Sequence, residues 1–210
     1  AIYQLALQEV DENSQTSVLV SQLEDSKTTN EKVSLIGIIG KLANPNDYPV
    51  LKRYLMGNEL ELKIAAVKAV AEWPNLDPLR DLMHILKKET ELRLHALALN
   101  STMELIDHSV LTNQEQAEAL KEILTYALND SEKKKLISGF GSVKDISAVR
   151  ALVELMGEKE LQAEIEASIK RIVGRYNESI PEEMTEELNK AEKRSSNTEF
   201  KSWVGEVTNR

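Results

Sequence analysis

A metal site is the first chemistry that the three histidines of this chain could provide. His84, His95 and His108 lie near the middle of the sequence, and Asp81 stands one helical turn before His84. A helical zinc site needs two histidines at i and i+4, or a set of Cys and His that completes the coordination shell. No pair of these histidines has that spacing, and the chain has no Cys. We therefore expect no metal site and partly exposed histidines.

Covalent or acid–base catalysis would also need a more specific pattern than the chain contains. Ser101 and Ser109 have no motif that would pair a hydroxyl with a histidine base. Carboxylates such as Glu160, Glu164 and Glu166 are the residue type that glycosidases use, but groups on one solvent-facing helix are ordinary, and a sugar site also needs aromatic walls. We expect no catalytic residue and no bound cofactor.

Phosphate and nucleic-acid recognition are disfavoured by charge and by motif. The chain has 35 acidic against 26 basic residues, a net charge of −9, which is the wrong sign for binding along phosphates. The basic run 133–135 stands alone, and Gly139-Phe140-Gly141 lacks the third glycine and the preceding strand of a phosphate loop. We expect no nucleic-acid partner, solvated lysines in the run, and a helix end at the two glycines.

The composition is that of a folded, soluble chain with an aliphatic core, because hydrophobic residues make up 41% and aromatic residues only 4%. No apolar run approaches 18 residues, so we expect no membrane span. The absence of Cys leaves the compartment open between the cytoplasm and an extracytoplasmic space. Because residues 1–10 begin without Met and look like the tail of a helix, we expect a fragment of a longer or processed protein.

Apolar residues recur at helical spacing nearly everywhere, and period-two alternation is never sustained, which predicts an all-α fold. Helix starts are marked by polar capping residues and by proline. Asp47 and Asp77 each precede a proline within two residues, Asn129 and Asp145 precede apolar runs, and Thr112 with Glu115 has the spacing of a capping box. The pattern predicts helices over residues 14–24, 30–42, 47–57, 59–73, 77–86, 90–106, 112–124, 129–140, 145–156 and 159–176.

The second helices of successive predicted hairpins superpose at a period near 30 residues. Residues 32–36 match 63–67 at a shift of 31, and these match 93–97 at a shift of 30. Residues 135–138 are a looser copy, 42 further on, because the connector 107–113 is long; we expect a local kink there. A fixed period favours stacked hairpins in a solenoid over a closed bundle.

On these residues the chain resembles the bacterial HEAT-like repeat family, whose second helices open on a basic residue followed by small apolar positions. The resemblance is clearest over 31–99 and extends over 14–176. It implies a right-handed α-α superhelix of the armadillo type, with about five helical hairpins, the first of them partial. A tetratricopeptide stack fits less well, because the 34-residue period and the Trp, Gly and Tyr pattern are absent. The HEAT-like DNA glycosylases would have a strongly basic concave face, which the charge does not fit.

The period breaks after Tyr176, so we divide the chain into a repeat array, residues 1–176, and a C-terminal helical extension, residues 177–210. Pro181 begins one helix of the extension, and Phe200 and Trp203 belong to an apolar stripe on another. We expect this extension to be a terminal cap folded on the last hairpin. The alternative is a docking helix for a neighbouring domain or protein.

Small residues recur in the second helices, where they would let neighbouring helices approach closely; they include Gly37, Gly40, Ala65, Ala66, Ala69 and Ala71. At the end of one such helix, Trp73 is expected to cover the hairpin edge; the alternative is that it anchors a partner.

The function that such stacks perform by shape is to present a concave surface to another macromolecule. We therefore expect a non-catalytic protein-binding scaffold. The family resemblance places the second helices on the concave side, and helical phase then nominates the solvent-facing residues Lys41, Lys68, Glu72, Asn100 and Glu104 as partner-binding. The alternative is an accessory repeat domain of a larger bacterial enzyme, which supports the enzyme or positions its substrate.

Overall fold

The computed structural model describes residues 12–176 and 179–209, with only the backbone of residues 12–15. All regular secondary structure in these residues is helical, and they contain no strand, which confirms the predicted all-α class. Across this described part of the chain, every helix is too short or too polar to span a bilayer. The predicted helix tail over residues 1–10 lies outside it.

The chain packs as two compact units, Ala1–Val110 and Leu111–Arg210. Their boundary falls inside the connector 107–113 that the sequence marks as unusually long. The boundary predicted from the sequence, between residues 176 and 177, does not coincide with the boundary between these two units. Each unit is described by itself below.

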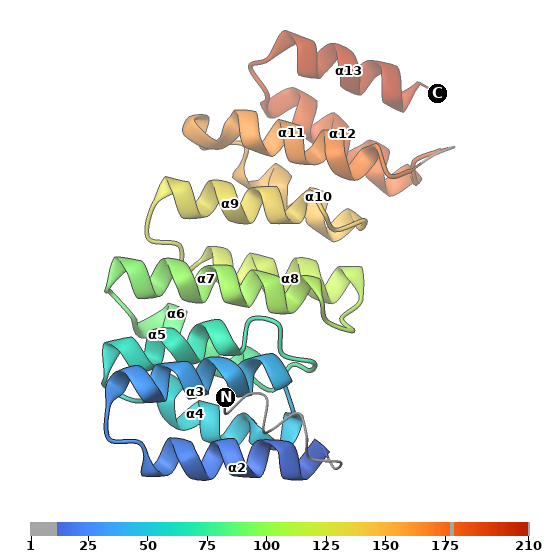
Figure 1. Cartoon of the computed structure of the whole chain (residues 1–210). Helices are drawn as coiled ribbons and strands as arrows, with labels where there is room; N and C mark the ends of the chain where they lie inside the picture. Colours follow the sequence, from blue (N-terminus) through green and yellow to red (C-terminus); the bar gives the residue numbers. More distant parts are fainter. Residues whose placement is uncertain (1–11, 177–178, 210) are drawn as a thin grey trace. The chain divides into compact units, whose positions relative to one another are not determined.

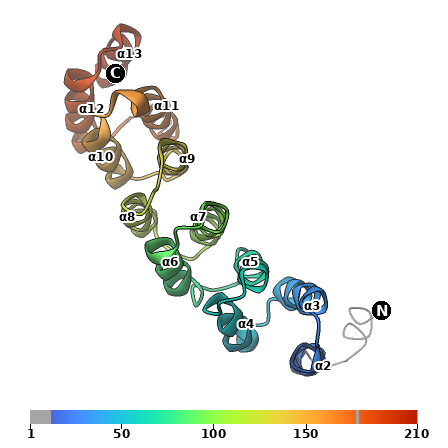
Figure 2. The ribbon, with the colours of Figure 1, turned by 90° about the vertical axis from the view of Figure 1, so that its left-hand side faces the viewer.

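The first unit is built from three pairs of successive helices, and the two helices of each pair contact each other. In space, α3 packs on α5 and α5 on α7, while α4 contacts α6, so that the helices form two rows (Figures 1 and 2). The helices are α2 (Glu12–Asp25), α3 (Thr29–Leu42), α4 (Tyr48–Leu55), α5 (Leu60–Ala69), α6 (Leu79–Lys88) and α7 (Leu92–Asp107), with a 3-10 turn, η1 (Pro45–Asp47), before α4.

The second unit follows the same two-row plan. One row consists of α8, α10 and α12, the other contains α9 and α11, and α13 packs on α12. Its helices are α8 (Asn113–Leu124), α9 (Asp130–Phe140), α10 (Ile146–Leu155), α11 (Gln162–Val173), α12 (Glu182–Arg194) and α13 (Thr198–Thr208), with the 3-10 turn η2 (Lys159–Leu161) before α11.

Aliphatic side chains fill the space between the rows of each unit. Ile36 of α3, Val67 of α5 and Leu82 of α6 are completely buried in the first unit. In the second unit, Phe200 and Val204 of α13 are completely buried as well. Apolar residues at helical spacing therefore do face the core, and the last helix is held by the same burial as the others.

The helix starts agree with the sequence where the capping residue acts within its own turn. Thr112 and Glu115 form the predicted capping box, and the side chains of Asn129 and Asp145 accept hydrogen bonds from the first turns of α9 and α10. Asp47 and Asp77 are different, because neither carboxylate caps the helix that follows. The proline in these turns presets the backbone for the helix and needs no cap of its own.

At Gly40, helix α3 packs tightly against α5. A Cβ atom placed on Gly40 would lie 2.5 Å from the Cβ of Ala69 and 2.7 Å from its Cα, closer than such atoms can approach. A Cβ atom placed on Gly37, one turn earlier, would meet nothing within 4 Å. Of these two glycines, only Gly40 therefore determines how closely α3 and α5 pack.

We predict that Gly40→Ala lowers the free energy of unfolding by about 1–3 kcal/mol, because the new methyl group must push α3 and α5 apart. Gly37→Ala is the matched control in the same helix. It should raise the free energy of unfolding by about 0.5–1 kcal/mol, because alanine restricts the unfolded chain and meets no obstacle. Urea unfolding followed by circular dichroism measures both. Equal effects of the two substitutions would contradict the close approach.

Candidate functional site

A groove of about 490 Å³ crosses the row formed by α3, α5 and α7. All five residues nominated from helical phase line it, and all five are exposed: Lys41, Lys68, Glu72, Asn100 and Glu104. The structure thus brings together, from three helices, side chains that lie up to 63 positions apart in the sequence. Whether they bind a partner remains a prediction.

The position of each charged residue follows from local helix geometry. Lys41 and Lys68 lie in the last turns of α3 and α5, where a cation is favoured by the partial negative charge of the helix end. Glu72 lies just beyond the end of α5, after its C-cap residue Val70. Asn100 and Glu104 are four residues apart on α7, so they share one face of that helix.

Small and apolar residues form the rest of the lining. They are Val33, Gly37, Gly40, Ala65, Ala69, Ala71 and Leu97, together with Ser101. Short side chains leave room for the main chain of a bound segment to approach the helices closely. Val33, Leu97 and Ser101 were not nominated from the sequence, although each lies three or four residues from a nominated position or a small residue on the same helix face.

The charges of the groove are not used to hold the fold together. Among the described residues, none of Lys41, Lys68, Glu72 and Glu104 forms an ion pair. The ion pairs of this unit use other residues: Arg53 pairs with Glu24 at 2.9 Å, and Lys63 pairs with Glu89 at 3.7 Å. The groove therefore presents charge that remains available to a ligand.

The larger hollow of the first unit, about 630 Å³, lies along α2 and α3 and is a weaker candidate. Three of its polar side chains form hydrogen bonds within these helices or at their ends. Ser26 donates to the carbonyl of Gln22, Thr28 accepts from the amide of Glu31, and Ser34 donates to the carbonyl of Asn30. This hollow is confined to one hairpin, α2, α3 and the turn between them, whereas the groove brings together side chains from three helices.

The titratable cluster of Tyr48, Lys52 and Asp81 joins α4 to α6. The Tyr48 hydroxyl donates to the Asp81 carboxylate, and the Lys52 ammonium lies 2.7 Å from the same oxygen. Burial alone would raise the pKa of Asp81, but the hydrogen bonds from Lys52 and Tyr48 and the positive charges of Lys52 and Arg80 hold it below its ordinary value. Burial, together with the nearby carboxylate, raises the pKa of Tyr48 far above its ordinary value.

This cluster lies outside the groove and is packed against the buried Trp73, whose ring centre is 6.1 Å from that of Tyr48. Trp73 is therefore a core residue of the hairpin, in line with the expectation that it covers an edge. Ion pairs and hydrogen bonds that hold helices together also perturb pKa values. We interpret it as the link between two neighbouring helices.

In the second unit, a buried carboxylate holds the last two helices. Glu166 of α11 accepts hydrogen bonds from Ser195 at 2.6 Å, from Gln162 at 2.7 Å and from Asn197 at 2.8 Å. Ser195 and Asn197 belong to the turn between α12 and α13, so the carboxylate fixes that turn against α11. The sequence showed Glu166 only as one of several helix carboxylates.

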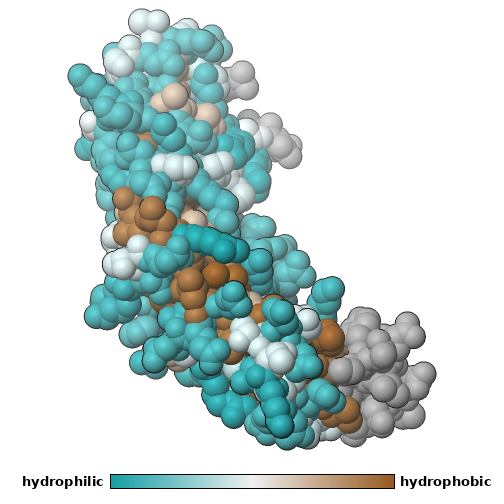
Figure 3. Space-filling model, turned by 60° about the vertical axis from the view of Figure 1, so that its left-hand side comes forward, coloured by the Kyte–Doolittle hydropathy of each residue, from teal (hydrophilic) through white to brown (hydrophobic). Residues whose placement is uncertain are grey.

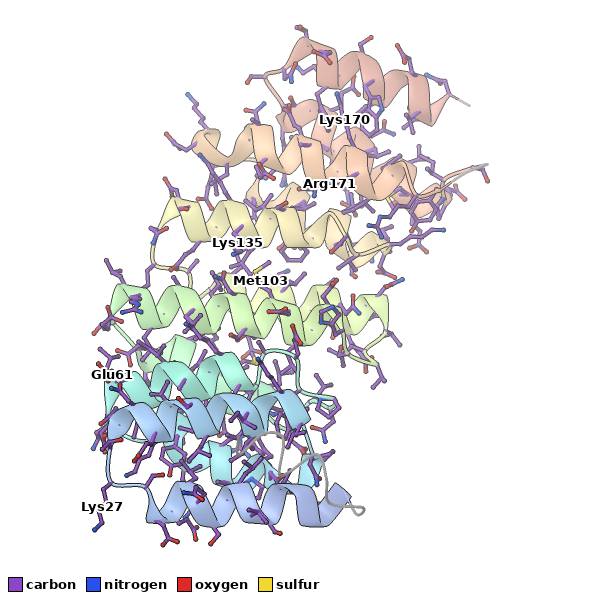
Figure 4. All side chains as sticks on the ribbon, viewed as in Figure 1. Lys27, Glu61, Met103, Lys135, Lys170 and Arg171 are labelled. Atoms are coloured by element: carbon purple, nitrogen blue, oxygen red, sulfur yellow. The ribbon has the colours of Figure 1, made fainter. Side chains whose placement is uncertain are left out.

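A cavity of about 430 Å³ lies between α11, α12 and α13. The ammonium of Lys170 stands 5.6 Å from the centre of the Trp203 ring, while its neighbour Arg171 donates to Ser138 of α9 (Figure 4). Trp203 is half-buried and rests on the fully buried Phe200, at 5.5 Å between ring centres. The apolar stripe of the extension therefore packs mainly inward.

The histidine prediction is wrong for one residue. His84 and His108 are exposed, but His95 is completely buried in α7. Its neighbours in α7 are apolar at helical spacing, so the row of helices encloses the ring. Within the described residues, no three His, Cys, Asp or Glu side chains are arranged to hold a metal ion.

The two motifs that could have contacted phosphate have local structural roles. The ammonium of Lys133 lies 2.7 Å from the carboxylate of Glu158, and this contact raises the pKa of Lys133. Phe140 is the last residue of α9, which confirms a helix end at the glycine pair.

Exposed apolar side chains form a further surface feature. Figure 3 shows apolar patches on a mainly hydrophilic face. In the first unit, Leu60 is 45% and Leu92 is 65% exposed, and they are the first residues of α5 and α7. Neither leucine belongs to the lining of the charged groove.

We predict that Asp81→Asn makes the melting temperature of the protein less dependent on pH in the acidic range. A carboxyl whose folded pKa is depressed stabilises the fold above its unfolded pKa of about 3.9, and this contribution is lost as the pH falls through the lower folded pKa. The melting temperature of Asp81→Asn should lie below that of the wild type at pH 7, and the difference should shrink below about pH 4. Thermal unfolding across pH measures this. The exposed Asp107→Asn is the control, and a constant difference for Asp81→Asn would contradict the ion pair.

Comparisons with known proteins give no family for this chain. No protein-family model matches it, and no curated protein matches it either. The observations that bear on function are therefore those of the groove: its lining, its floor of small residues and its exposed charges.

Proposed function

We propose that the chain is a non-catalytic protein-binding scaffold, a right-handed α-solenoid of HEAT-like hairpins that binds a peptide segment of a partner protein in the groove across α3, α5 and α7. The observation that carries the proposal is the groove itself. Three helices in one row contribute exposed charged side chains around a floor of glycine and alanine.

The hairpin periodicity supports the solenoid part of this proposal. Within the first unit, each second helix packs beside the next, as α3, α5 and α7 do. A single hairpin cannot bury its apolar face, so neighbouring hairpins must cover it, and a row of equivalent helices results. Equivalent helices present equivalent positions to solvent, which places residues from three repeats along one surface.

The chemistry of the lining suits a peptide. The groove volume, about 490 Å³, lies within the range of sites that hold a compact ligand or a short segment. Glycine and alanine allow close approach of a main chain, and the polar rim supplies hydrogen bonds and charge for specificity.

Selection from a displayed random peptide library tests the proposal. The full chain is the bait, and bound peptides are then measured against Lys41→Glu/Lys68→Glu. We expect affinities to fall about tenfold or more, because two favourable charges become unfavourable at the rim.

The matched control is Lys87→Glu/Lys88→Glu. These lysines are exposed, lie in the last turn of α6 and are not part of the groove lining, so the change in charge and helix-end electrostatics is the same. Circular dichroism checks that both variants fold. Peptides that bind the groove variant and the control equally, or no selected peptides at all, would contradict the proposed function.

A further inference from the structure

The charges along the groove are ordered. Among the described residues that line the groove, the one charged side chain from α3 is Lys41 and the one from α7 is Glu104. Between them, α5 and the residues just after it contribute one charge of each sign, Lys68 and Glu72. The groove therefore changes from positive at α3 to negative at α7.

The separation of the two ends follows from helix packing. Neighbouring helices pack with their axes about 8–10 Å apart, so α3 and α7, which both contact α5, are roughly 16–20 Å apart. An extended peptide advances about 3.3 Å per residue, so five or six residues cover that distance. A segment of five or six residues is therefore long enough to contact both charged ends of the groove.

The floor of the groove favours an extended segment over a helix. Gly37, Gly40, Ala65 and Ala69 have a short side chain or none, so the main chain of an extended segment can approach α3 and α5 closely. A helix carries side chains on every face, and these keep its own main chain away from such a floor.

From these observations we propose that the groove binds an extended peptide segment in one orientation, with a carboxylate beside Lys41 and, five or six residues away, a cationic side chain beside Glu104. This inference rests on the proposed function and specifies the ligand. Charges at an exposed rim determine orientation and specificity more than affinity, and their effect weakens with salt.

Charge-reversal rescue tests the orientation. The probe is the tightest groove-dependent peptide from the selection described above, which should carry an acid and a base five or six residues apart. Replacing its acid by Lys should weaken binding to the wild type about five- to tenfold, and Lys41→Glu should restore most of the loss. Replacing its base by Glu should be rescued in the same way by Glu104→Lys.

The crossed combinations are the internal control. Lys41→Glu should not rescue the peptide whose base was changed, and Glu104→Lys should not rescue the peptide whose acid was changed. An off-groove pair, Lys87→Glu and Asp107→Lys, should rescue neither, because both residues are exposed and outside the lining.

The outcomes separate this inference from the function on which it rests. Groove-dependent peptides that are uniformly acidic or basic, or that are rescued equally by both reversals, would overturn the orientation and leave the scaffold in place. Absence of any groove-dependent peptide would overturn both. Rescue only by the matching reversal supports the ordered groove.

Discussion

The contact between Gly40 and Ala69 is the constraint on which the rest of the first unit depends. A glycine at this point lets α3 approach α5 until its backbone meets the Ala69 backbone, closer than any side chain would permit. This contact sets the spacing between α3 and α5. It also makes the floor of the groove, because a larger residue in either helix would separate the helices and fill the space above them. The stability of this unit and the shape of the groove therefore depend on the same small side chains.

The parts of the structure that the sequence predicted are those determined within a few residues. The capping box at Thr112, the caps at Asn129 and Asp145, and the helix end at Phe140 each involve atoms of one turn. The groove residues belong to the same class. Each was nominated from the phase of its own helix, and the regular packing of equivalent helices brings such positions to one surface.

Features that arise between helices could not be read from the sequence in this way. The ring of His95 is buried because other helices enclose it, and nothing in its own turn distinguishes it from His84. The hydrogen bonds of Glu166 with Ser195 and Asn197 join residues about thirty positions apart. Ala43 ends α3 with a left-handed backbone, φ 50°, where glycine would be expected, so no sequence pattern marks it.

Two sets of ionisable groups in the first unit have different structural roles. Tyr48 and Asp81 have perturbed pKa values, and the hydrogen bond between them joins α4 to α6. Lys41 and Glu104 lie on the other row, exposed to solvent. Perturbed groups at a reactive centre would be expected to face a cavity. The groove is lined instead by the exposed side chains of Lys41, Lys68, Glu72 and Glu104, so the groups that join α4 to α6 and the groups that line the groove are separate.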